Sequence, residues 1–183
     1  MKILILNGSP RMKGNTNSVS QLLKAQLEPL HEVEILNVTK LNLTGCLGCY
    51  ACRKNGGHCI CKDDSNLLNA KVEAADAVIF ATPVYWWGIS GQLKTAIDKF
   101  QSRSESYLNQ PKKVGLVMIG ADALDSPQYR LIREQFDCIT NFLHWELVFS
   151  LPLSALEPGE VLAQCDINER VQQCADSLIK ALH

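Results

Sequence analysis

The segment Gly8–Asn17 combines glycines with hydroxyl and amide side chains and one arginine. It follows an apolar run, Ile3–Leu6, and precedes an amphipathic stretch that begins near Ser18. We therefore expect a strand to enter this loop and a helix to leave it. The free N–H groups and the positive dipole end of a helix start form an anion site, which suits a phosphate monoester. The side chains that could donate to it are Ser9, Arg11, Asn15, Thr16 and Asn17.

The residues that this loop lacks limit which phosphate-containing ligands it could bind. A Walker loop would need a lysine where Asn15 stands, and the dinucleotide pattern Gly-x-Gly-x-x-Gly is absent. Thr39 and Lys40 stand where a ribose-binding acid would end the second strand. A terminal, singly esterified phosphate is left, and flavin mononucleotide (FMN) carries one. A plain capped turn without a ligand is the alternative.

Composition excludes several classes of protein. The chain has 183 residues, a net charge of −1, 46% hydrophobic residues and no cluster of lysine or arginine. We therefore expect no nucleic-acid partner, and no apolar run approaches the ~20 residues that cross a membrane. The start of the chain reads as a strand rather than an export signal, and eight cysteines without such a signal indicate a reducing, cytoplasmic compartment.

Short apolar runs alternate with helical patterns, which is typical of a parallel α/β sheet. The expected strands are Lys2–Asn7, Val33–Val38, Ala77–Ala81, Val114–Ile119 and Glu146–Leu151. The expected helices lie near 16–28, 65–75, 91–102, 127–142 and 167–182. With one N-terminal phosphate loop, this pattern predicts a flavodoxin-like, five-stranded parallel sheet of order 2-1-3-4-5 with helices on both faces. We expect residues 1–183 to form a single domain with a cysteine-rich insertion at 41–64, and a second long loop at 152–164.

A second candidate loop follows the third strand. In the predicted sheet it lies beside the first loop, and Ser90 is placed to cap the next helix. A planar, electron-poor ring needs apolar or aromatic walls and backbone donors. The residues that could supply them are Pro83, Val84, Tyr85, Trp86, Trp87 and Gly88. The tryptophans could instead belong to the core or to an interface.

The cysteines give the other strong signal, in the pattern Cys46-x2-Cys49-x2-Cys52-x6-Cys59-x-Cys61. Four of them, Cys46, Cys49, Cys52 and Cys59, have a spacing that could hold a [4Fe–4S] cluster or a zinc ion. Free thiols and a redox disulfide are the alternatives. We expect the scattered Cys138, Cys165 and Cys174 to be small core residues. The histidines show no ligand spacing, and no catalytic triad or carboxylate pair stands out.

Together, the loops Gly8–Asn17 and Pro83–Lys99 resemble those of the NAD(P)H-dependent FMN reductases, a flavodoxin-like grouping that includes quinone reductases and iron–sulfur flavoproteins. The resemblance covers roughly the first 120 residues. It implies that the first loop binds the FMN phosphate and that residues 83–88 run along the ring. It also places Gly120, after the fourth strand, against the ring, while it gives no role to Asp122.

The function implied is an oxidoreductase that passes electrons from NAD(P)H through FMN to a flavin, a quinone or another small acceptor. No side chain of the protein is then a catalytic acid, base or nucleophile, because the flavin carries the chemistry. One alternative is an iron–sulfur flavoprotein, an electron carrier fed by a ferredoxin-like donor. Another is a non-enzymatic zinc or thiol sensor. We expect a homodimer or homotetramer. The sequence does not separate NADH from NADPH.

Overall fold

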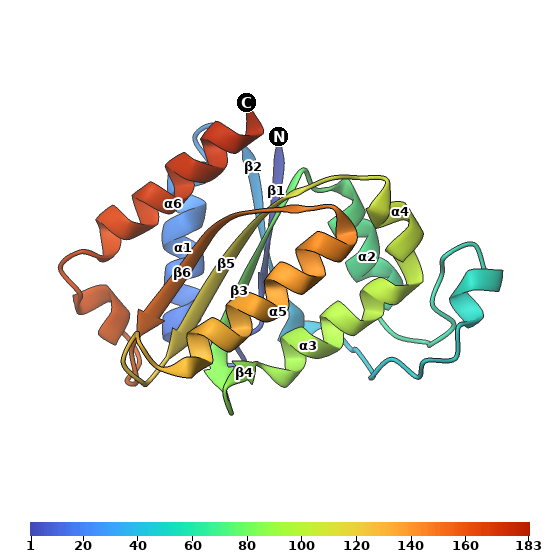
Figure 1. Cartoon of the computed structure of the whole chain (residues 1–183), viewed down its shortest axis with the longest axis horizontal. Helices are drawn as coiled ribbons and strands as arrows, with labels where there is room; N and C mark the ends of the chain where they lie inside the picture. Colours follow the sequence, from blue (N-terminus) through green and yellow to red (C-terminus); the bar gives the residue numbers. More distant parts are fainter.

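The computed structural model describes residues 1–183 and places five parallel strands at its centre, in the order β2-β1-β3-β5-β6 (Figure 1). The strands are β1 (Lys2–Asn7), β2 (Glu32–Asn37), β3 (Ala77–Tyr85), β4 (Gly88–Ile89), β5 (Lys113–Gly120) and β6 (Glu146–Ser154). The helices are α1 (Asn15–Leu27), α2 (Ser65–Ala74), α3 (Gly91–Asp98), α4 (Ser104–Leu108), α5 (Pro127–Leu143) and α6 (Ile167–Leu182). The predicted order of parallel strands is confirmed.

The sheet is covered on both faces because neighbouring strand residues point to opposite sides. Leu4 of β1 packs in a core with α2, α3 and α5, whereas Ile5 packs in a second core with α1 and α6. In Figure 1, α1 and α6 lie together on one side and α2, α3 and α5 on the other. The nearly unbroken apolar sequence of β1 and β3 reflects burial on both faces.

Three predicted elements differ from the observed ones by more than one residue at an end. Strand β3 continues to Tyr85 and pairs with the antiparallel strand β4 through the turn residues Trp86 and Trp87. The predicted helix 91–102 ends as an α-helix at Asp98 and continues as a 3-10 helix, Lys99–Arg103. Strand β6 runs through Ser154, so less of the segment 152–164 is loop, and part of the remainder is a 3-10 helix, Glu160–Ala163.

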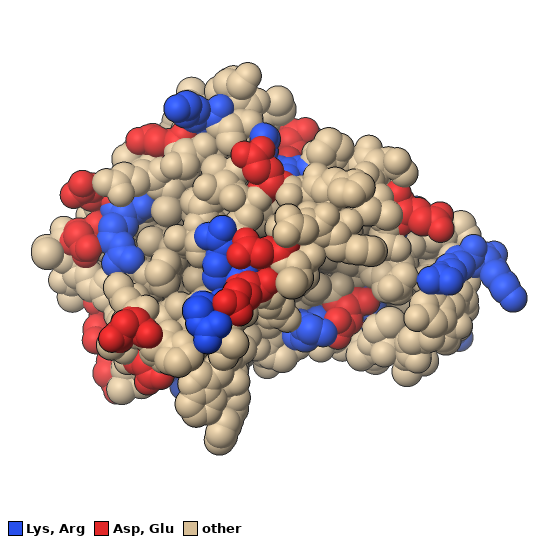
Figure 2. All heavy atoms as spheres, viewed as in Figure 1, with Lys and Arg blue, Asp and Glu red and all other residues tan.

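The residues from Leu41 to Asp64 form an excursion that projects from the body between β2 and α2 (Figure 1). Its regular structure is a 3-10 helix, Ala51–Lys54. The excursion is closed at its base, where Asn42 and Asp64 exchange hydrogen bonds of 2.7 and 2.9 Å. Among the helices of the protein, none combines the length and apolar character needed to cross a membrane. On the face shown in Figure 2, lysine and arginine side chains are interspersed with those of aspartate and glutamate.

Candidate functional site

The first loop is fixed against the start of α3. The N–H of Gly8 donates to the carbonyl oxygen of Ala81 in β3 (2.8 Å), and the Ser90 hydroxyl donates to the carbonyl oxygen of Gly8 (2.7 Å). Ser90 also accepts from the N–H of Leu93 and so caps α3, as predicted. A Cβ at position 8 would lie 2.7 Å from both Leu93 Cβ and Ser90 Oγ, so only glycine fits here.

A groove of about 160 Å³ opens at the carboxyl ends of the parallel strands. The first loop, Gly8–Asn17, called the phosphate-type loop from here on, contributes Ser9, Arg11, Gly14, Asn15 and Thr16 to the groove. Strand β3 contributes Pro83, Val84 and Tyr85, and the end of β5 contributes Ile119, Gly120 and Ala121. The segment after β6 contributes Ala155, Leu156 and Pro158. The structure thus brings together, in one groove, three regions that are far apart in sequence and that the sequence analysis singled out, together with a fourth.

One end of this groove is suited to an anion. The backbone N–H groups of Asn15 and Thr16, at the start of α1, have no acceptor within the chain, and no acidic residue lies in the first turn. The Thr16 side chain is buried and forms no hydrogen bond, while the exposed Arg11 forms no ion pair. Donors without a protein partner therefore meet the positive end of a helix dipole, which is the arrangement that binds phosphate.

The side chains of two predicted donors, Asn15 and Asn17, form hydrogen bonds with other residues of the chain. The Asn15 side chain donates to the carbonyl oxygen of Glu157 (2.9 Å) and accepts from the N–H of Gly159 (2.9 Å), so it ties the segment after β6 to α1. The Asn17 side chain accepts from Asn7 (3.3 Å) and does not line the groove. The roles of both residues toward a ligand stay predictions, with the backbone N–H of Asn15 as its free donor.

The second loop is a hairpin whose tip lies outside the groove. Trp86 is 91% exposed, and neither it nor Trp87 nor Gly88 lines the groove. Both tryptophans adopt positive φ angles, of 49° and 58°. A two-residue hairpin turn of type I′ requires this left-handed backbone at both positions, and asparagine and glycine adopt it far more readily than tryptophan. The strained backbone therefore holds two aromatic rings at the rim, next to Tyr85.

Sequence reasoning missed the groove residues Ala155, Leu156 and Pro158. The available signal was the length of the segment 152–164. Asp122, to which the resemblance gives no role, has a structural explanation. Its carboxylate accepts from Ser126 (3.1 Å), just before α5, and its carbonyl oxygen accepts from the buried Tyr129 hydroxyl (3.1 Å).

The five cysteines of the excursion, Cys46, Cys49, Cys52, Cys59 and Cys61, surround one small cavity of about 30 Å³. All five are free thiols. No three histidine, cysteine or acidic side chains converge closely enough to hold a single metal ion. The cysteines are thus gathered around a common space rather than a common point.

The backbone around this cavity also suits an anionic, sulfur-ligated group. Gly48 and Tyr50 adopt left-handed conformations that curve the chain between successive cysteines. The N–H groups of residues 45–50 have no acceptor within the chain. Burial tends to raise the pKa of the Cys59 thiol, but hydrogen bonds from Cys61 and Ser65 and the charge of Lys99 outweigh it and lower that pKa. Cysteine sulfurs and backbone turns of this kind are the usual surroundings of iron–sulfur clusters.

The prediction that the other three cysteines are core residues was right only for Cys174. It is buried on the apolar face of α6, where burial raises its pKa to about 11. Cys138 and Cys165 are exposed. Cys138 lies on the outer face of α5, and Cys165 lies in the connection just before α6, so neither faces the core.

The sheet order and the groove at the strand ends define a flavodoxin-like α/β protein. Two solved structures support the fold. The Trp repressor binding protein of Bacillus subtilis has a TM-score of 0.70 at 20% identity, with 94% of this chain and 96% of that one covered. An FMN-dependent NADH-azoreductase of Bacillus anthracis, solved with FMN, has a TM-score of 0.70 at 12% identity, with both chains fully covered.

The chain belongs to the NADPH-dependent FMN reductase family, whose model matches residues 1–133. It is 34% identical over 122 residues to an iron–sulfur flavoprotein, MJ1083, of Methanocaldococcus jannaschii, with 66% of this chain and 63% of that one covered. It is 25% identical over 178 residues to YwqN of Bacillus subtilis, named as an NAD(P)H-dependent FMN-containing oxidoreductase, with 88% and 90% covered. The matches span about half to two thirds of the length of the first four curated relatives.

Proposed function

We propose that this protein binds FMN in the strand-end groove and transfers electrons from NAD(P)H to a flavin, a quinone or another small acceptor. The observation that carries the proposal is the groove itself. It joins an anion site at the start of α1 to the apolar walls of β3 and β5. A mononucleotide with a terminal phosphate and a planar ring matches this combination of polar and apolar ends. Membership of the FMN reductase family supports the same ligand.

In this proposal the residues of the chain bind FMN and orient its ring. The free N–H groups of Asn15 and Thr16 and the guanidinium of Arg11 hold the phosphate. The backbone and side chains of Pro83, Val84 and Tyr85 form one wall for the ring. The ring, when bound, supplies the electron-accepting chemistry, so no acid or base of the protein is required.

The exposed hairpin tip supports two further parts of the proposal. A groove of about 160 Å³ is smaller than the roughly 300 Å³ or more of complete small-molecule sites, so one chain encloses only part of the ligand. Trp86 and Trp87 offer apolar surface at its rim. We propose that the nicotinamide stacks beside this hairpin and that a second copy of the chain covers it, in a homodimer or homotetramer.

Two titrations and one kinetic assay test this function. FMN should bind more tightly than riboflavin, because riboflavin lacks the phosphate. FMN-loaded protein should lose its flavin absorbance when NADH or NADPH is added without oxygen. Equal affinity for FMN and riboflavin would contradict the phosphate site. Failure of both nicotinamides to reduce the flavin, together with reduction by a ferredoxin, would replace the reductase by an electron carrier.

The cysteine cavity favours a second candidate, in which the protein also holds a [4Fe–4S] cluster on the excursion. Cys46, Cys49, Cys52 and Cys59 are the proposed ligands, and Cys61 is one thiol more than a cluster needs. Several similar proteins are named iron–sulfur flavoproteins. Anaerobic reconstitution should give about four iron and four sulfide per chain. Bound zinc and no iron would favour the sensor alternative instead.

A further inference from the structure

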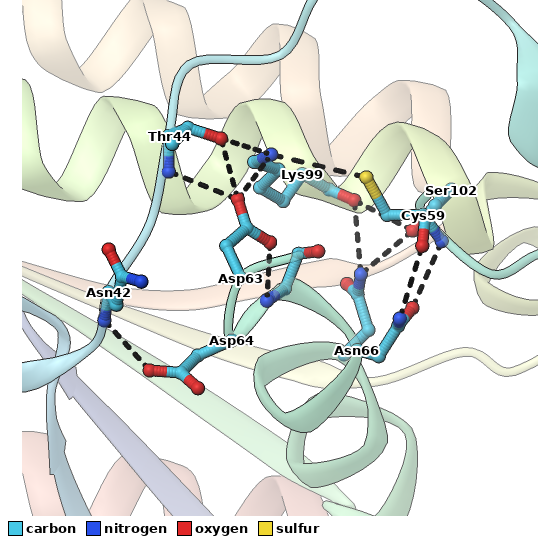
Figure 3. A network of polar contacts seen from close by, with 10 residues as sticks. Asn42, Thr44, Cys59, Asp63, Asp64, Asn66, Lys99 and Ser102 are labelled. Atoms are coloured by element: carbon cyan, nitrogen blue, oxygen red, sulfur yellow. Dashed lines mark hydrogen bonds and ion pairs between the residues drawn. The ribbon is translucent and has the colours of Figure 1, made fainter. Parts of the chain in front are cut away.

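Lys99 is a buried cation in the wall of the cysteine cavity. It lies just after α3, and its side chain is 1% exposed. Figure 3 shows its amino group between the carboxylate of Asp63 and the sulfur of Cys59. Its Nζ lies 2.8 Å from Asp63 Oδ2, 3.4 Å from Thr44 Oγ1 and 4.0 Å from Cys59 Sγ.

Asp63 holds this cation from the base of the excursion. Its carboxylate accepts hydrogen bonds from the N–H and hydroxyl of Thr44 and from the N–H of Ser65. Lys99 is therefore a fixed positive charge whose position is set by both ends of the excursion.

Cys59 is held on its other side by Asn66 of α2. The Asn66 side chain accepts from the N–H of Cys59 (3.0 Å) and donates to its carbonyl oxygen (3.2 Å). Figure 3 shows these paired contacts beside the sulfur that faces Lys99. The backbone of this cysteine is thus fixed, and its sulfur lies toward the cation.

The charge balance of the cavity makes this cation unusual. Lys99 is the only lysine or arginine among the residues that line the cavity, which otherwise holds five thiols and Asp98. A buried ion pair is often no more stable than an apolar pair of the same size, so fold stability alone does not explain it. A cation at this position would stabilise negative charge on the cysteine sulfurs or on a group that they bind.

We propose that Lys99 is a positioning residue for the group held by the cysteines, orienting Cys59 and supplying the counter-charge that makes this group easier to reduce. This inference rests on the proposed cluster. Local charge and hydrogen bonds to sulfur are established determinants of iron–sulfur reduction potentials. Removing a buried positive charge next to a ligand sulfur disfavours the added electron, so the potential falls.

The test compares reconstituted FMN-loaded proteins in a redox titration with dithionite, followed by EPR of the reduced cluster. Lys99→Met should keep its iron and sulfide but give a more negative midpoint potential. Lys99→Arg keeps the charge and should stay near the wild type. Lys54→Met is the control, since it removes an exposed lysine of the excursion that does not line the cavity and should leave the potential unchanged.

Each outcome decides a separate point. Loaded Lys99→Met protein with the wild-type potential would overturn the inference alone, as would an equal shift in Lys54→Met. Wild-type protein that takes up no iron would overturn the cluster proposal and this inference with it, while the FMN reductase assay stands apart. If Lys99→Met holds no cluster, retention by Lys99→Arg supports the role of the charge, and equal loss in both variants overturns it.

Discussion

Replacing Arg11 by alanine tests the phosphate site most directly. Arg11 lines the groove, is exposed and forms no ion pair, so its removal leaves the fold of the loop intact. Hydrogen bonds to charged groups contribute about 1.5–3 kcal/mol. Because this guanidinium is exposed to water, we expect the lower end of that range. About 1.5 kcal/mol corresponds to roughly a tenfold weaker affinity for FMN.

The assay is a fluorescence titration of wild type, Arg11→Ala and Lys13→Ala with FMN and with riboflavin. Lys13 is an exposed cation on the same loop that does not line the groove, so its removal serves as the control. We expect a loss of about one decade for FMN in Arg11→Ala, little change for riboflavin, and less than about threefold for Lys13→Ala. Equal weakening of FMN and riboflavin in Arg11→Ala, or an equal effect of Lys13→Ala, would refute the reasoning.

Three other expected results follow from the geometry. Asn15→Ala loses hydrogen bonds to Glu157 and Gly159, which should lower the free energy of unfolding by about 1–3 kcal/mol in urea; an unchanged midpoint would contradict this. Replacing Trp86–Trp87 by Asn-Gly should relax the turn and lower kcat/KM for the nicotinamide more than it weakens FMN binding; a loss confined to FMN affinity would oppose it. Burial tends to raise the pKa of Asp63, but hydrogen bonds from Lys99, Ser65 and Thr44 hold that pKa well below its usual value. The ionised carboxylate therefore stabilises the fold fully above about pH 4, and this contribution is lost as the pH falls further. Asp63→Asn should make the free energy of unfolding depend less steeply on pH in the acid range, and an unchanged dependence would refute this.

Local patterns predicted most of the fold. The alternation of apolar runs and helical periods gave five parallel strands in the right order, because strands buried on both faces and amphipathic helices leave distinct patterns. The predicted boundaries were wrong where contacts between distant residues determine the end of a strand. Strand β3 extends to Tyr85 because it pairs with β4, and β6 extends to Ser154 because it follows β5 in register as far as Gly120. No local signal specifies either pairing.

The parts of the candidate site that lie in one loop could be predicted from the sequence, whereas those that depend on distant contacts could not. Ser9, Arg11 and Thr16 were found because a strand-to-helix loop carries a recognisable composition. Leu156 and Pro158 were missed because contacts between distant segments bring them to the groove. Among these contacts, the Asn15 side chain binds residues more than 140 positions away, and the N–H of Ala155 donates to the carbonyl oxygen of Gly120. The contact of Lys99 with Asp63 and Cys59 likewise depends on how the excursion folds back onto the body.

Helix α3 connects the two parts of the molecule in which chemistry is proposed. At its start, Ser90 caps the helix and binds Gly8 of the phosphate-type loop. Directly after its end, Lys99 enters the cysteine cavity. Eight residues of helix span about 12 Å, and the side chains of Leu93 and Ala96 between these ends are buried in the core. A rigid element of this length fixes the groove and the cavity relative to each other. The position of the cysteine cavity therefore depends on the same packed core that shapes the strand-end groove, rather than on the excursion alone.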